Sequence, residues 1–211
     1  KFFWDQDLLT PLSLRTDFLN QIVFHKKLGS LEDKVNRIQS LAPKICDLIP
    51  NSNADEVIRA AQLSKADLTT DLVGEFPELQ GVVGGYYASE SGESMGVATA
   101  IAEHYSPKGP NDTCPTSTTS VILGLADRID TLVSFWSINE KPTGSKDPFA
   151  LRRAGLGVIR LIVENQIRIP LLTIFNYAGA SDNLSKEIFS FLEERLKVFL
   201  REKGVRHDLI S

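Results

Sequence analysis

Apolar residues in this chain recur at spacings of three and four, which is the period of one face of an α-helix. The clearest series consists of Leu31, Val35, Ile38, Ala42, Ile45 and Ile49. Ser30 stands immediately before this series and Asp33 lies three residues further on, which resembles a capping box with Asp in place of the usual Glu. The series therefore predicts a helix over residues 31–49. Because no segment shows the alternation of apolar and polar residues that is typical of a half-buried strand, the sequence predicts an all-α fold.

Similar apolar series predict further helices over residues 53–74, 95–105, 121–136, 149–165 and 184–203. The first of these has a start signal in Asn53, which is followed by Glu56 three residues later. The last is followed by Gly204, a residue typical of helix C-caps.

Glycine and proline mark the connections between these helices. Residues 74–96 are rich in glycine and residues 106–117 in proline, so both are expected to be turn-rich, and residues 176–183 are expected to be a linker. The segment Gly81-Val82-Val83-Gly84-Gly85 lacks the preceding strand and the following Lys-Ser/Thr of a phosphate-binding loop. We therefore interpret it as part of a connection.

Composition limits the possible protein classes. The chain has 211 residues, of which 42% are hydrophobic and 24% charged, values that are ordinary for a globular protein. Cys46 and Cys114 are far apart and are expected to be reduced thiols of a cytoplasmic protein. No apolar run approaches the ~20 residues needed to cross a bilayer, and the N-terminus does not resemble a signal peptide. Since the chain lacks an initiator Met, we expect it to be a fragment of a longer protein.

The net charge of −4 gives no general signal for nucleic acid, so any contact with RNA must come from a local patch. Residues 141–170 carry a local charge of +4, from Lys141, Lys146, Arg152, Arg153, Arg160 and Arg168 against Asp147 and Glu164. A loop at 141–148 leads into the helix predicted at 149–165, and either Ser145 or Asp147 is expected to cap it. Free backbone N–H groups at this helix start would suit a phosphate group. The alternative is a capped helix whose arginines pair with acids elsewhere.

Other polar residues give weaker signals. His25, His104 and His207 are scattered, and an isolated His is more often structural than a ligand. Asp127 lies at roughly 140° from Ile122 around the helix axis, which predicts a solvated carboxylate. No Ser-His-Asp or Cys-His arrangement is evident.

Several segments together resemble the β subunit of bacterial glycyl-tRNA synthetase. They are KFFWDQDLLTPL, FHKKLGSLEDKVNRI, KADLTTDLVGEFPELQGVVGGYY, AEHYSPKGPNDTCPTS, LADRIDTLVSFWSI and KPTGSKDPFALRRAGLGVIRLI. They follow the order of the family and cover nearly everything from residue 1 to about 165. The C-terminal EERLKVFLREKGVRHDLIS resembles the start of the family's helical anticodon-binding domain.

The resemblance implies a part of a heteromeric α/β ligase that joins glycine to its tRNA with ATP. It implies an HD-domain-like helical bundle over residues 1–175, followed over residues 184–211 by the beginning of a helical anticodon-binding domain. The expected partners are the α subunit, which carries the aminoacylation site, and tRNA(Gly), with no DNA and no membrane. No catalytic residue and no cofactor are expected in this segment, whereas the complete enzyme would use ATP and Mg²⁺.

A working HD phosphohydrolase binds metal through a first His, a His-Asp doublet and a distal Asp. Here His25 stands near the first position and Asp127 near the last. The region of the doublet reads Ser64-Lys65-Ala66-Asp67, so no His precedes Asp67, and Lys65 would bring a cation to the place of the metal. The resemblance therefore implies that a hydrolytic centre is missing.

These residues allow three hypotheses about function. The first is tRNA holding, in which Lys141, Lys146, Arg152 and Arg153 contact phosphates and Arg160 adds long-range charge. The second is a metal-dependent HD-type phosphohydrolase that would use His25, Asp67, His104 and Asp127. The third is a purely structural role in subunit docking through the segment Glu75-Phe76-Pro77-Glu78-Leu79 and its neighbours.

Overall fold

The computed structural model of the chain describes residues 1–206, 208 and 210; His207 lies outside the described residues. The α-helices are α1 (Phe2–Asp7), α2 (Leu12–Arg15), α3 (Leu31–Cys46), α4 (Ala54–Leu63), α5 (Asp71–Glu75), α6 (Val82–Glu90), α7 (Met95–Glu103), α8 (Thr118–Ser137), α9 (Leu151–Glu164), α10 (Leu171–Tyr177) and α11 (Asp182–Glu202). Short 3₁₀ turns are η1 (Thr16–Gln21), η2 (Ala66–Thr69) and η3 (Pro77–Leu79). The strands β1 (Val23–His25) and β2 (Gly29–Ser30) form a small antiparallel hairpin.

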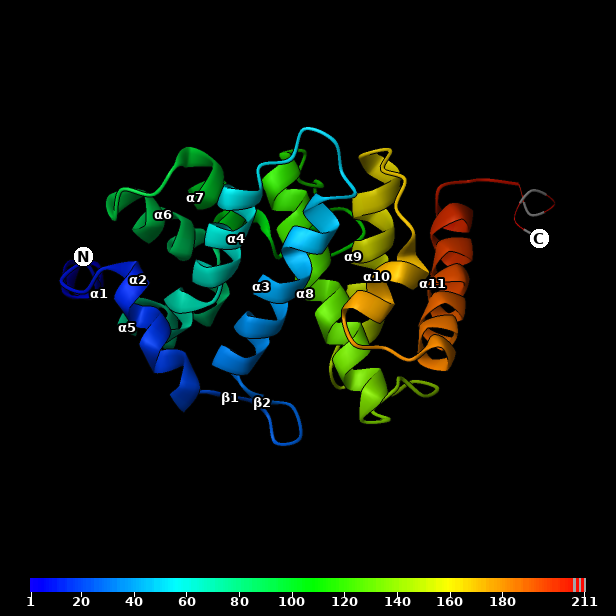
Figure 1. The fold of residues 1–211 in the computed structure, drawn as a ribbon, viewed down its shortest axis with the longest axis horizontal. Coiled ribbons are helices and arrows are strands. Elements are labelled where there is room, and N and C mark those ends of the chain that lie inside the picture. Colours follow the sequence, from blue (N-terminus) through cyan, green and yellow to red (C-terminus); the bar gives the residue numbers. More distant parts are fainter. Residues whose placement is uncertain (207, 209, 211) are drawn as a thin grey trace.

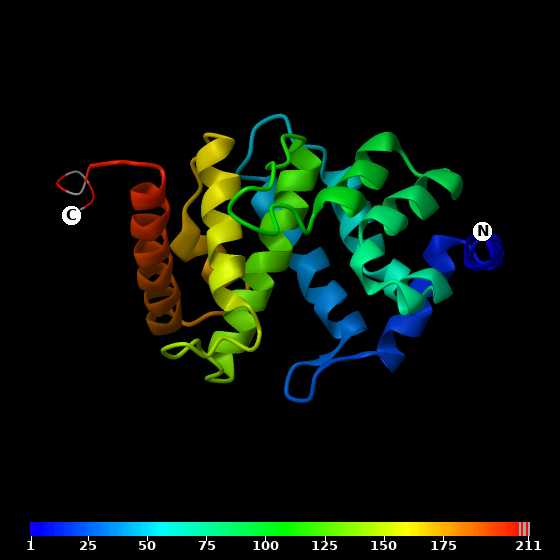
Figure 2. The same ribbon diagram turned by 180° about the vertical axis from the view of Figure 1, so that it is seen from behind.

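Helix α8 is the centre of the fold. It packs against α3, α4, α7, α9 and α11, and nearly all its residues are buried, so it is a core helix rather than an amphipathic surface helix. Figures 1 and 2 show α3, α8, α9 and α11 side by side, with α1 and α11 near opposite ends of the molecule. The predicted all-α class is confirmed, apart from the small hairpin.

Local start signals were predicted correctly. The Ser30 hydroxyl accepts a hydrogen bond from the backbone N–H of Asp33, and the Asp33 carboxylate accepts one from that of Ser30, so the capping box at α3 is complete. The side chain of Asn53 likewise caps α4. Cys46 and Cys114 are free, as predicted, and both are buried. Among the described residues, no helix combines the length and apolar character needed to cross a membrane.

The single helix predicted over residues 53–74 is wrong, because the helix ends at Leu63 and is followed by η2 and α5. Side chains near the break bind backbone groups that a continuous helix would use. The Thr70 hydroxyl donates to the carbonyl oxygen of Asp67 and also caps α5 by accepting a bond from the N–H of Val73. Such local bonds compete with the helical ladder.

The turn-rich connection predicted for residues 74–96 is also partly wrong, since this stretch contains α6. Gly85 allows α6 to lie directly on α7: a Cβ atom at this position would stand 2.8 Å from the Cβ atom of Ala102 and 2.8 Å from the carbonyl oxygen of Ala98. The glycines of this helix therefore serve close packing between helices.

The C-terminal helix α11 belongs to the same core as the rest of the chain. Ile188, Leu192 and Phe199 are buried in the cluster that α8 and α9 also form. The residues predicted as a linker, 176–183, contain the end of α10 and the start of α11. The assignment of residues 184–211 to a separate anticodon-binding domain stays a prediction.

We predict that Gly85→Ala lowers the free energy of unfolding by about 1–3 kcal/mol, because the added methyl group overpacks the contact between α6 and α7. Urea denaturation measures this change. The matched control is Gly74→Ala on α5, where a Cβ atom would meet nothing within 4 Å. The control is expected to be neutral or slightly stabilising. Equal effects of the two substitutions would contradict the role assigned to Gly85.

Candidate functional site

Buried polar side chains from four parts of the chain meet at α8. We call Lys34, Lys65, His104, Asp127 and Asp130 the lysine–aspartate cluster. The Lys65 ammonium lies 2.7 Å from Oδ2 of Asp127 and 2.9 Å from Nε2 of His104. The Lys34 ammonium lies 3.0 Å from Oδ1 of Asp127 and 3.0 Å from Oδ2 of Asp130. Asp127 is thus held between two ammonium groups.

The hydrogen bonds of His104 define its tautomer. Nδ1 is 2.7 Å from the carbonyl oxygen of Ile101, so it carries the proton and donates to that carbonyl. Nε2 is then the acceptor for the Lys65 ammonium. Burial and the neighbouring Lys65 lower the pKa of His104 to about 3, so the imidazole is neutral at physiological pH.

The predicted solvation of Asp127 is wrong. Its side chain is buried, because α8 is covered on its polar side as well as on its apolar face. Burial alone would raise the pKa of Asp127, but Lys65 and Lys34 lower it well below its usual range. The helical-wheel argument failed because a buried ion cluster covers a face that the sequence pattern presents as polar.

The four residues of the phosphohydrolase hypothesis are not brought together as one ligand set. His104 and Asp127 are neighbours, whereas the His25 ring packs edge-on against Phe135 and Phe149. Asp67 is buried, and its Oδ2 accepts a hydrogen bond from the backbone N–H of Gly81. Among the described residues, no group of three His, Cys, Asp or Glu side chains could hold a metal ion. His104 and Asp127 are bound to Lys65, and the other two candidates have different partners, so the residues present do not fit a metal.

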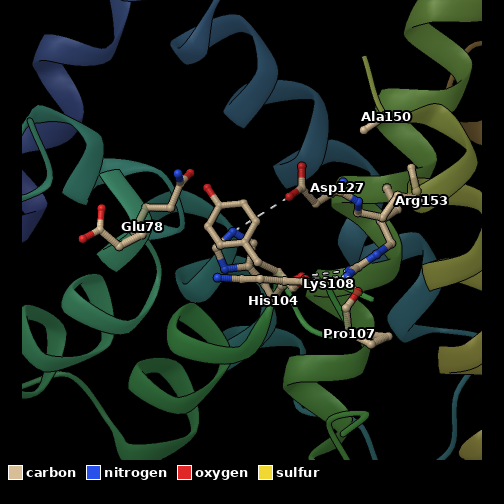
Figure 3. A pocket seen from close by; sticks show the side chains of 11 residues that line it. Glu78, His104, Pro107, Lys108, Asp127, Ala150 and Arg153 are labelled. Carbon is tan, nitrogen blue, oxygen red and sulfur yellow. Dashed lines mark hydrogen bonds and ion pairs between the residues drawn. The ribbon is translucent and has the colours of Figure 1, made fainter. Parts of the chain in front are cut away.

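A pocket of about 360 Å³ opens above this cluster (Figure 3). We call it the Tyr105 pocket; its lining includes Gln80, Tyr105, Lys108, Asp127, Arg153 and Ala154. One wall is the turn over residues 104–107. The buried guanidinium of Arg128 holds this turn by donating to the carbonyl oxygens of His104, Tyr105 and Pro107 at 2.8–3.1 Å.

The start of α9 differs from the prediction. The Asp147 carboxylate accepts hydrogen bonds from the backbone N–H groups of Leu151 and Arg152, at 2.8 and 3.0 Å. Asp147 was one of the two predicted caps. Because it occupies these N–H groups, the prediction that they are free for a phosphate is wrong.

The cations predicted to bind tRNA have different surroundings. Lys146 and Arg153 are exposed, and Arg152 is partly exposed and donates to the carbonyl oxygen of Gly144. Lys141 forms an exposed ion pair with Glu187, and such pairs are weak.

Arg160 was predicted to add long-range charge, and this is wrong. Its side chain is buried, pairs with Glu164 at 2.7 Å and donates to the carbonyl oxygens of Gly109 and Asp112. Arg160 therefore fastens the 106–112 loop to α9, and its charge is neutralised.

Two further cations were not identified from the sequence. Lys108 and Arg195 line a groove of about 290 Å³ together with Arg152 and Arg153; we call these four residues the α9–α11 groove. Lys108 stands in the 106–112 loop and Arg195 follows two glutamates on α11. Neither belongs to a basic segment, so only the packing of α9 against α11 and the loop reveals them.

We predict that Lys65→Met lowers the free energy of unfolding by about 3 kcal/mol or more, because it leaves Asp127 buried with one cation fewer. Denaturant titration measures the loss. The control is Lys186→Met on the surface of α11, which is expected to change stability by less than about 0.5 kcal/mol. A loss no larger than that of the control would contradict the proposed charge balance.

A second prediction concerns pH. The pKa of His104 is about 3 in the folded protein against an ordinary value of 6.5, so between these values the unfolded chain binds one more proton. His104 thus contributes stability above pH 6.5 that is lost as the pH falls towards 3, at about 1.4 kcal/mol per pH unit. His104→Gln is expected to flatten the pH dependence of unfolding between pH 5 and 6.5. An unaltered slope in His104→Gln would refute the assignment.

Comparison with known proteins places the chain in a family. The family described as glycyl-tRNA synthetase beta subunit matches residues 1–211. The chain is 53% identical to a glycine–tRNA ligase beta subunit of Rhodospirillum centenum, 46% to that of Phenylobacterium zucineum and 48% to that of a Ruegeria species. Each match covers 100% of this chain and 31%, 30% and 31% of the respective relative, so the chain spans about a third of their length. The chain therefore belongs to the glycyl-tRNA synthetase beta subunit family.

Proposed function

We propose that this chain is part of a cytoplasmic, heteromeric glycine–tRNA ligase and that it holds tRNA(Gly) for glycylation at the site of the α subunit. The observation that carries the tRNA-holding role is the gathering of exposed cations at the start of α9 on a chain of net charge −4. Lys146 and Arg153 are exposed there, and Lys108 approaches from a different loop. Phosphate groups of RNA are the natural ligands of such a patch.

The proposed role is binding rather than bond making. In the lysine–aspartate cluster, the lone pairs of Asp127 and of Nε2 of His104 accept hydrogen bonds from lysines. We therefore do not propose the metal-dependent phosphohydrolase. In the complete enzyme, ATP and Mg²⁺ would act at the α subunit.

Subunit docking is compatible with this role. Phe76, in the segment Glu75–Leu79 predicted to dock, is 43% exposed, and nearby Val82 and Tyr86 on α6 are 46% and 62% exposed. Exposed apolar groups that lie near one another are typical of protein interfaces. We propose that the exposed apolar residues of α6, together with Phe76, contact another part of the enzyme.

The test is tRNA binding by the complete enzyme over a salt series, with Lys146→Ala/Arg152→Ala/Arg153→Ala against wild type. Each lost phosphate contact removes a counterion-release contribution, so affinity is expected to fall on the order of ten-fold or more. The slope of log affinity against log salt is expected to become shallower by about two to three units.

The matched control removes three exposed lysines elsewhere, in Lys26→Ala/Lys44→Ala/Lys186→Ala. It changes the net charge by the same amount. A difference between the two variants therefore reports the position of the cations and not the net charge. If both triple variants bind tRNA with the affinity and slope of the wild type, the proposed patch is refuted.

A further inference from the structure

The Tyr105 pocket and the α9–α11 groove are adjacent. Lys108 and Arg153 line both of them, so these two cations stand where the pocket and the groove meet. Figure 3 shows Glu78 and Arg153 on opposite sides of the pocket, with Lys108 between them in this view. A ligand in the pocket would therefore have one end beside two exposed cations.

The interior of the pocket suits a flat, partly apolar group. Its lining includes the Tyr105 ring and the small apolar residues Pro107 and Ala154, with the Gln80 side chain as a polar group. One ring face of Tyr105 is in contact with the Lys65 ammonium, 4.0 Å from the ring centroid. The volume of about 360 Å³ lies in the range of small-molecule sites and is enough for one nucleoside.

The charge around the pocket favours an anion despite the carboxylate in its floor. Asp127 is compensated by Lys34 and Lys65, so it does not present a net negative charge to a ligand. The rim cations Lys108 and Arg153 are exposed, and the exposed carboxylate of Glu78 lies across the pocket from Arg153. A phosphate group beside Lys108 and Arg153 would thus meet positive charge.

The groove continues this positive surface. Arg152 and Arg195 extend it beyond Lys108 and Arg153, with Glu202 as the acid in its lining. Nε of Arg195 is buried and has no hydrogen-bond partner among the residues that the structure describes. A buried donor without a partner is costly, and a small movement of the Arg195 side chain would bring it to a phosphate oxygen in the groove.

We propose that the Tyr105 pocket takes one unpaired nucleotide of an RNA strand, whose flanking phosphates lie on Lys108 and Arg153 and along the α9–α11 groove. A pocket for the base beside a cationic track for the backbone is the arrangement by which proteins hold single-stranded nucleic acid. This inference rests on the proposed tRNA-holding function. It specifies that the part of the RNA bound in the pocket is an unpaired nucleotide. It assigns binding roles to Lys108 and Arg195, which the basic segment 141–170 does not include.

The first test fills the pocket without changing its charge. Ala154→Leu in the complete enzyme is expected to lower tRNA affinity about five-fold or more, because the base loses its place. The slope of log affinity against log salt should stay that of the wild type, since no phosphate contact is removed. The control is Ala54→Leu at the exposed start of α4.

This design separates the two proposals. If the cation variants lose affinity and Ala154→Leu does not, the pocket inference is overturned and the tRNA-holding function stands. If none of the variants changes tRNA binding, both are overturned.

The second test identifies the bound nucleotide. Glu78→p-benzoylphenylalanine puts a photocrosslinker at the exposed edge of the pocket, and Ser89→p-benzoylphenylalanine on α6 is the control. With tRNA bound to the complete enzyme, the crosslink at position 78 is expected at an unpaired nucleotide. A crosslink confined to base-paired stems, or none above the control, would overturn the proposal.

A free nucleotide is the other source of the same chemistry. Irradiation of the wild-type enzyme with 8-azidoadenosine monophosphate, followed by peptide mapping, tests it. Labelling of the peptide that contains Tyr105 and Lys108, without a tRNA crosslink at position 78, would assign the pocket to free nucleotides and overturn the RNA proposal.

Discussion

The carboxylate of Asp127, held between two buried ammonium groups, is the interaction on which the interior of this fold depends. Lys34 reaches it from α3 and Lys65 from the turn that follows α4, while His104 at the end of α7 shares the Lys65 ammonium. One charged group thus ties several helices to α8. Isolated, it would be costly to bury, and so would either lysine. The charges are tolerated only together. The helices must therefore take one defined arrangement, because close packing in another arrangement would leave a buried charge without its partner.

The same region shows how close packing forms the pocket. Gly157 lets α9 approach the Arg128 side chain, since a Cβ atom there would lie 2.2 Å from Nε of Arg128. The Arg128 guanidinium is consequently buried and binds the carbonyl oxygens of the turn over residues 104–107. That turn carries Tyr105 and leads to Lys108. Arg128, which itself lines the pocket, therefore holds the turn that forms one wall of it.

What could be predicted from the sequence depended on the range of the interaction. The caps at Ser30 and Asn53 act within four residues, and the sequence alone was enough to predict both helix starts. Gly85 could not be interpreted, because its neighbour Ala102 comes from another helix, and a glycine-rich stretch is equally typical of a loop. The patch at residues 141–160 was only partly recognised: net charge does not distinguish exposed Arg153 from Arg160, which is buried against Glu164. Lys65 is the one long-range contact that was predicted, because the family resemblance places it beside the expected metal ligands.

Two ammonium groups differ from a divalent metal in a way that explains the proposed role. Together they carry the same charge, so Asp127 can stay ionised and buried. An ammonium has no open coordination position and does not polarise a bound water as a metal does, so the cluster cannot activate a nucleophile. It also fixes the floor of the pocket permanently, whereas a metal site depends on the supply of its ion. A centre of this kind cannot cleave a phosphorylated ligand, and the proposed attraction for RNA comes from the exposed cations Lys108 and Arg153 instead. Holding RNA without hydrolysing it is the property that a tRNA-binding subunit needs.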